Sequence, residues 1–160
     1  MPYSLLMKMK PFIRSVLLCP CILTAAFSSA GAEVCSPTQP DMLGPFYQED
    51  APVRSTVGKG YVLSGAVRSS KTCLPVNGAQ IEFWLVGPDG EYDDSRRATV
   101  FADKKGAYRF ESNFPAPYFG RPPHIHIRVT ARGFSPLVTQ HYPEKGKSAA
   151  VFDLVLIPSE

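Results

Sequence analysis

Two histidines, His124 and His126, stand two positions apart in an apolar stretch, and Tyr118 precedes them. Side chains on a β-strand alternate between its two faces, so both imidazoles would point to the same side, about 6.6 Å apart along the strand. Two imidazoles at that spacing can bind one metal ion through their nitrogen atoms. The alternative interpretation is a half-buried strand whose histidines lie on its polar face. The spacing therefore predicts a candidate metal site. The neighbouring residues must show whether the histidines bind a metal or only form the polar face of a strand.

The N-terminal segment has the pattern of a secretory signal peptide. Three basic residues precede a short apolar run, and the small residues at 30–32 follow it. This run is too short and wrongly flanked for a membrane span. A buried N-terminal helix is the alternative, which Pro20 disfavours because it interrupts the apolar run. We expect residues 1–32 to be a cleaved signal peptide and residues 33–160 to form one exported domain, periplasmic or extracellular and without membrane attachment.

Charge and cysteine usage narrow the class of protein. The chain has 17 basic and 14 acidic residues, and the signal segment holds three of the basic ones and none of the acidic ones. The remaining balance gives no support for binding to nucleic acid or to an anionic membrane. Cys35 and Cys73 remain after cleavage, and an even pair in an oxidising compartment predicts a disulfide. A pair of metal-binding thiolates is the less favoured alternative, since no Cys-x-x-Cys spacing exists.

Hydrophobic alternation predicts β-structure throughout the exported domain. Residues 33–60 contain four prolines and no periodicity, which predicts an extended arm ordered by packing. Turns rich in glycine, proline and aspartate separate the expected strands. These strands cover residues 61–68, 80–86, 98–102, 107–111, 124–131, 137–142 and 150–157. Short strands at this spacing predict an all-β fold, a single β-sandwich that carries the extended arm.

Several short motifs follow one another along the exported domain. They are Gly-Pro-Phe-Tyr at 44–47, Gly-Ala-Gln-Ile-Glu-Phe-Trp at 78–84, Gly-Glu-Tyr at 90–92, Pro-Tyr at 117–118, Arg-Pro-Pro-His-Ile-His at 121–126 and Thr-Gln-His-Tyr at 139–142. In this order they resemble the intradiol ring-cleavage dioxygenase family, in a small exported form. Each motif alone is weak, and their joint presence makes the resemblance specific.

The resemblance implies a ferric ion, Fe(III), held by Tyr92, Tyr118, His124 and His126. The chemistry explains these residue types, because a hard, highly charged cation favours anionic oxygen. An oxygen-reactive ferrous site more often uses two histidines and one carboxylate. Taken alone, Tyr92 would be a surface tyrosine in a turn, and Tyr118 a loop tyrosine packed on proline.

The resemblance also implies roles around the metal. Arg121 would stabilise negative charge on a bound aromatic ring, with Gln140 as a hydrogen-bonding neighbour of Arg121 or of the substrate. Tyr118 would leave the metal when a catechol binds through both its oxygens. For Trp84 ordinary core packing is an equal alternative, and His141 is expected to be an exposed strand-end residue without a role. The expected pocket walls are Gly44, Pro45, Tyr47 and Trp84.

The implied activity is Fe(III)-dependent cleavage of a catechol-type ring by O2 to a cis,cis-muconate-type diacid. The sequence does not identify which catechol is the substrate. It also leaves the oligomeric state open, with a homo-oligomer among the alternatives. The short spacing between Tyr118 and His124 predicts a trimmed pocket loop relative to better-known members. We also expect the chain to lack the helical N-terminal dimerisation region of the catechol-cleaving branch. Residues 65–110 also resemble transthyretin-like modules, so a non-catalytic binding module is the alternative. A further alternative is an exported protein that binds iron and a catechol but cleaves the catechol poorly.

Overall fold

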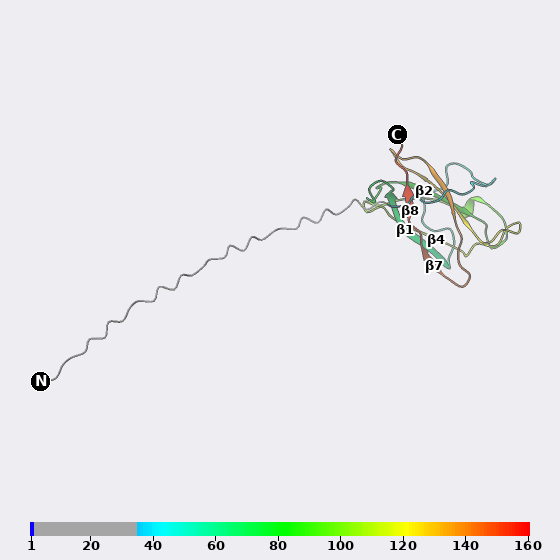
Figure 1. Ribbon diagram of the computed structural model, residues 1–160. Coiled ribbons are helices and arrows are strands. Elements are labelled where there is room, and N and C mark those ends of the chain that lie inside the picture. The colour runs from blue at the N-terminus through cyan, green and yellow to red at the C-terminus, as the bar shows by residue number, and fades with distance from the viewer. Residues whose placement is uncertain (2–34) are drawn as a thin grey trace. The chain divides into compact units, whose positions relative to one another are not determined.

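The computed structural model describes Met1 and residues 35–160, so the expected signal peptide lies outside the described residues. Within this range the chain forms eight strands and one short 3-10 turn, η1 (Asp94–Arg96), and the strands make two four-stranded sheets (Figure 1). The expectation of an all-β fold is confirmed. Among these residues no helix has the length and apolar character needed to cross a membrane.

The first sheet is built around β1 (Tyr61–Ser69), the longest strand. β4 (Ala107–Ser112) pairs with β1 in antiparallel orientation. β7 (Ala149–Val151) and β8 (Leu154–Leu156) pair in parallel with successive parts of the other edge of β1. All four strands carry labels in Figure 1, where β8 and β7 lie along β1.

The second sheet has the order β3-β2-β5-β6, and all its pairs are antiparallel. Its strands are β2 (Gln80–Leu85), β3 (Arg97–Phe101), β5 (Ile125–Thr130) and β6 (Leu137–His141). The register places Trp84 opposite His126, and His126 opposite Gln140. Six of the seven predicted strands are confirmed to within one residue at each end.

The seventh predicted strand, residues 150–157, is wrong as a single element, because it forms the two strands β7 and β8. Between them Phe152 turns its carbonyl onto β1, where a side chain on Gly65 would collide with it. The carboxylate of Asp153 accepts a hydrogen bond from the Ala66 amide at 2.8 Å, replacing a backbone partner. The strand is therefore interrupted where a side chain takes over its pairing.

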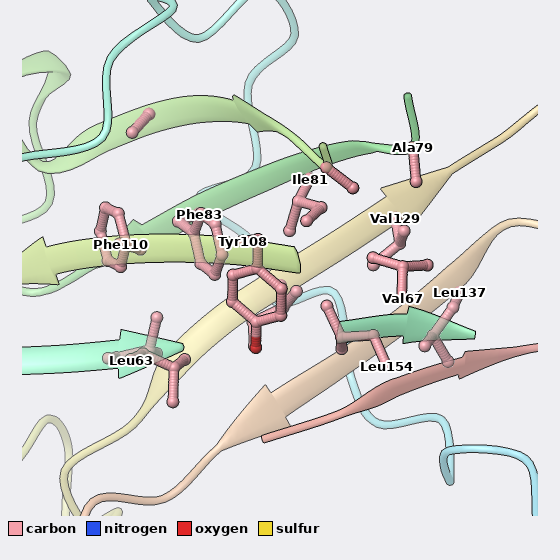
Figure 2. Packing of buried hydrophobic residues seen from close by; sticks show 14 of the residues in the cluster. Leu63, Val67, Ala79, Ile81, Phe83, Tyr108, Phe110, Val129, Leu137 and Leu154 are labelled. Atoms are coloured by element: carbon pink, nitrogen blue, oxygen red, sulfur yellow. The ribbon is translucent and has the colours of Figure 1, made fainter. Parts of the chain in front are cut away.

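The hydrophobic core lies between the two sheets. Alternate residues of β2 point into it, and Ile81, Phe83 and Leu85 are fully buried. The ring of Phe83 stacks on that of Phe110 from β4, with centroids 4.2 Å apart (Figure 2). Full burial of such a side chain contributes about 1.5–3 kcal/mol, so this inner face supplies much of the fold's stability.

The arm, residues 35–60, contacts both sheets without forming a regular strand. Val53 bridges Thr99 of β3, and Thr56 bridges Glu111 of β4. These isolated bridges explain why the segment is ordered although it has no strand periodicity.

The start of the arm is covalently fixed. Cys35 forms a disulfide with Cys73, which lies in the turn after β1, and the predicted bond is confirmed. Next to it the Thr38 amide donates to the Val155 carbonyl of β8 at 3.1 Å. From there the arm runs to the second sheet, where the Gln39 carbonyl accepts a hydrogen bond from Thr139 of β6 at 2.9 Å.

Candidate metal centre

The outer face of the second sheet carries polar and aromatic side chains that are nevertheless buried. Glu82, Trp84, His126 and Gln140 are only 2–5% exposed, although they point away from the hydrophobic core. The arm covers this face. Buried polar groups are costly unless they have partners, so each of these side chains requires an explanation.

The two histidines lie side by side, with ring centroids 4.8 Å apart. His124 Nδ1 is 2.8 Å from the Pro122 carbonyl and so acts as a donor there, which leaves Nε2 with its lone pair, 3.3 Å from the Tyr92 hydroxyl. Burial lowers the pKa of both rings, that of His126 to about 4. Both imidazoles are therefore neutral at pH 7, the form that binds metals.

His126 is held between two flat surfaces. The Trp84 ring stacks on it, with centroids 4.9 Å apart and planes within 6°. Gly44 of the arm approaches it so closely that an added Cβ would lie 2.8 Å from the imidazole Cε1, and Gly44 also has a φ of +75°. Only glycine satisfies both conditions. His126 Nδ1 is buried and has no hydrogen-bond partner within residues 35–160.

Tyr92 reaches the histidines from a tight turn. The Gly87 amide donates to the Glu91 carbonyl at 2.8 Å, and Gly90 takes a φ of +84° that suits its missing side chain. Burial raises the pKa of Tyr92 to about 12, although the nearby charge of Arg121 opposes this shift. At neutral pH the hydroxyl is therefore protonated unless a bound cation ionises it.

Tyr118 completes the aromatic cluster. Its ring lies edge-on to Tyr92, with centroids 5.2 Å apart. Phe46 of the arm stacks on Tyr92 at 4.4 Å and meets Tyr118 edge-on at 5.5 Å. Phe46 belongs to the Gly-Pro-Phe-Tyr motif at 44–47, which predicted no separate role for it. The structure makes it the residue that packs the two tyrosines together.

All four predicted ligand residues thus converge at one place on the outer face. Within the part of the chain that the structure describes, no cluster of His, Cys, Asp and Glu alone could hold a metal ion, so a metal here requires the tyrosines. Two phenols that ionise beside a cation and two neutral imidazoles suit a hard, highly charged ion. This donor set, in which His124 Nε2 faces the Tyr92 hydroxyl with its lone pair free, fits Fe(III).

Arg121 stands beside this cluster in a hydrogen-bonded network. Its Nη2 donates to Gln140 Oε1 at 2.7 Å and to the Tyr142 hydroxyl at 3.0 Å. Gln140 Nε2 in turn donates to the Met42 carbonyl at 2.6 Å, and the Tyr142 hydroxyl donates to Asp41 at 2.9 Å. Sequence reasoning missed Asp41 and Tyr142. The strand period could have indicated Tyr142, since it lies two residues after Gln140.

The three remaining expected pocket residues, Pro45, Tyr47 and Trp84, differ in burial. Tyr47 contacts the Trp84 ring at 5.2 Å between centroids, and its hydroxyl donates to the buried Glu82 at 3.2 Å. Glu82 also forms an ion pair with Arg128 at 2.6 Å. Pro45 is exposed. Trp84 is as deeply buried as a core residue, but it lies outside the core cluster and stacks on His126 on the outer face.

The expectation that His141 is exposed is wrong. It is half-buried on the inner face of β6, and its Nε2 lies 2.7 Å from the Tyr61 hydroxyl. The two rings also stack, with centroids 5.9 Å apart. His141 follows Gln140 directly and therefore points to the opposite face of the sheet, away from the metal centre.

Comparisons with known proteins give relatives of one kind. A scan against protein-family models finds no match. The chain is 34% identical to a chlorocatechol 1,2-dioxygenase of Pseudomonas sp. strain P51 in an alignment of 149 positions that covers 72% of this chain. It is 30% identical to one of Pseudomonas putida in an alignment of 168 positions that covers 84% of this chain. The chain spans 59% and 64% of the lengths of these two curated relatives.

One solved structure has a similar fold. The dioxygenase domain of a dioxygenase carbohydrate-binding protein fusion from Streptomyces sp. SirexAA-E matches with a TM-score of 0.70 and 26% identity, covering 78% of this chain and 100% of that domain. Fold and site therefore define a two-sheet β-protein with a cluster of tyrosines and histidines on one outer face. The chain belongs to the intradiol ring-cleavage dioxygenase family, as its motifs indicate.

Proposed function

We propose that this protein is an exported enzyme that uses Fe(III) and O2 to cleave a catechol ring between its two hydroxylated carbons. One observation carries the proposal. Tyr92 and Tyr118, which are half-buried on a turn and a hairpin, converge with His124 and His126, which are buried at the start of β5. The names of the related chlorocatechol dioxygenases support the same substrate class.

The donor set fits this chemistry. A bound ferric ion would supply the Lewis acidity that favours a catecholate and the redox partner that makes its ring reactive towards O2. Tyr92 and Tyr118 would contribute two negative charges, and His124 and His126 two neutral nitrogens. The protein thereby offsets two of the three charges of the ion, and the remaining positive charge attracts an anionic substrate.

The surrounding residues bind and orient the substrate and move a proton. Tyr118 would leave the donor set as a catechol binds, and its phenolate oxygen would accept one of the two protons that the catechol releases, the other passing to solvent water. Arg121 stabilises the negative charge that builds on the ring, and Gln140 holds the guanidinium in place. Phe46 and Trp84 exclude water. One carbon–carbon bond breaks, and both oxygen atoms of O2 enter the two carboxylates of the product.

Oxygen uptake tests the proposal. We expect the iron-loaded protein to consume O2 with catechol, protocatechuate or hydroxyquinol, and to form a cis,cis-muconate-type diacid in equal amount. Calorimetric titration of the same compounds separates the alternatives. A protein that binds catechols with full iron content but consumes no O2 is a binding protein, and the proposed activity is then wrong.

We also propose that the mature chain is exported. The disulfide between Cys35 and Cys73 supports this, because such bonds persist in oxidising compartments. Alkylation without reductant, followed by mass spectrometry, should find no free thiol, and the mature N-terminus should lie near residue 33. Two labelled thiols or an uncleaved N-terminus in the native protein would contradict export.

A further inference from the structure

A two-residue turn joins Tyr118 to Arg121. The Arg121 amide donates to the Tyr118 carbonyl at 2.9 Å, and the Tyr118 amide donates to the Arg121 carbonyl at 3.3 Å. The central residues Phe119 and Gly120 have φ angles of +47° and +76°. Positive φ at both central residues identifies a type I′ turn, in which asparagine, aspartate and glycine are preferred.

Phenylalanine is an unfavourable residue at this position. A side chain with a Cβ is strained at positive φ, and only asparagine or aspartate offsets part of the strain with local hydrogen bonds. Burial gives no compensation, because Phe119 is 89% exposed. Asp50 also has a positive φ, of +59°, but its short polar side chain makes the conformational strain smaller. Strain of this kind persists mainly at functional sites.

The position of Phe119 relates it to the candidate metal centre. Its ring packs edge-on against Tyr118, with centroids 4.7 Å apart. Met42 and Leu43 are also exposed, at 58% and 38%, and they directly precede Gly44, which contacts His126. Exposed apolar side chains therefore occur on both segments that flank the centre, the arm and the hairpin. The most exposed of them, Phe119, is also the one in ring contact with a proposed metal ligand, Tyr118.

We propose that Phe119 is a specificity-determining residue whose exposed ring contacts an apolar substituent, in particular a second aromatic ring, on the catechol. The preferred substrates are then catechols with an apolar substituent rather than unsubstituted or carboxylated ones. This inference rests on the proposed function. A contact between two aromatic rings amounts to about a threefold to tenfold preference.

The substitution Phe119→Asn tests the inference with two independent measurements. Asparagine suits the turn, so the melting temperature should rise by about 2–4 °C. The ratio of kcat/KM for 4-phenylcatechol to that for catechol should fall about threefold to tenfold, and the calorimetric affinity for 4-phenylcatechol should fall in parallel. Phe119→Tyr should keep the parent ratio, since it retains the ring.

Phe101→Asn is the matched control. Phe101 is 51% exposed on β3, four residues along from Arg97, which pairs with Trp84, so it lies about 13 Å further along the sheet. This variant should neither gain stability nor change the ratio.

The outcomes separate the inference from the proposed function. If Phe119→Asn raises the melting temperature but leaves the substrate ratio unchanged, the inference is wrong and catechol cleavage stands. If the iron-loaded parent cleaves neither compound, the proposed function fails, and the inference fails with it.

Discussion

The two faces of the second sheet are both buried, but they differ in chemistry. On β2 the inner residue Phe83 is fully buried and stacks on another phenylalanine, whereas its neighbours Glu82 and Trp84 face the arm. On β5 the inner residue Ile127 follows the outer residue His126 directly. The period of two lets each strand supply the core and the candidate site separately. Changes on one face should therefore leave the function of the other face intact.

The faces also differ in what buries them. The inner face is covered by the other sheet and gains stability from apolar area. The outer face is covered by the arm, and its polar groups need specific partners, such as the ion pair between Glu82 and Arg128. Removing one member of such a network lowers the stability of the fold, because a buried polar group then loses its partner. The arm and the strands therefore depend on each other's side chains.

The largest expected effect follows from the outer-face histidines. His124→Ala or His126→Ala should abolish iron retention, because each imidazole supplies one of the protein's four proposed bonds to the metal. Elemental analysis after gel filtration measures the retained iron. His141→Gln is the matched control on the inner face, and it should retain the parent's iron content. Loss of iron from His141→Gln with retention in His126→Ala would reverse our assignment.

Arg121→Ala should reduce turnover about 10²–10³-fold, as expected when a charge-stabilising donor is removed from a closed site. The variant should keep its iron and still bind catechol, because Arg121 is proposed to act on the reacting ring. Oxygen uptake and calorimetry measure the two properties. Arg109→Ala, which removes an exposed arginine of β4, should behave like the parent. If Arg121→Ala loses iron outright, the arginine is structural.

On the inner face, Phe83→Ala should lower the free energy of unfolding by about 3–5 kcal/mol, because it leaves a cavity against Phe110. Denaturant titration measures this loss. The fraction that stays folded should bind the same amount of iron as the parent. A folded Phe83→Ala protein that binds no iron would show that the two faces are not independent.

The smallest effect concerns acid stability. Burial lowers the pKa of His141 in the folded protein below its ordinary value of about 6.5. The unfolded chain then binds the proton more readily, so the contribution of His141 to stability is complete above pH 6.5 and is lost as the pH falls below it. His141→Gln, compared with the parent in the same metal state, should show a smaller drop in melting temperature between pH 7.5 and 5. An equal drop would contradict the burial of His141.

The sequence predicted most strand positions because the alternation on β2 and β5 is strong. It could not predict which strands pair, since the parallel pairing of β7 and β8 with β1 depends on contacts distant along the chain. The break between β7 and β8 was missed for the same reason. It arises where Phe152 and Asp153 meet Gly65 and Ala66, far away in sequence.

The candidate site was predictable where residues lie two apart, as in His124 and His126. It was less predictable in the arm, where Asp41 and Phe46 lie in a proline-rich segment without periodicity. Their contacts with Tyr142 and Tyr92 appear only once the arm covers the sheet. Arg121 and Gln140 lie 19 residues apart and meet through the pairing of β5 with β6.

The visible spectrum of the iron-loaded protein tests the central claim most directly. Ferric ion bound by tyrosinate gives a strong charge-transfer band, so the protein with Tyr92 and Tyr118 at the metal should be red. The band should disappear on chelation and be absent from His126→Ala. A protein with full iron content by elemental analysis and no visible band would contradict the claim that these tyrosines hold the metal.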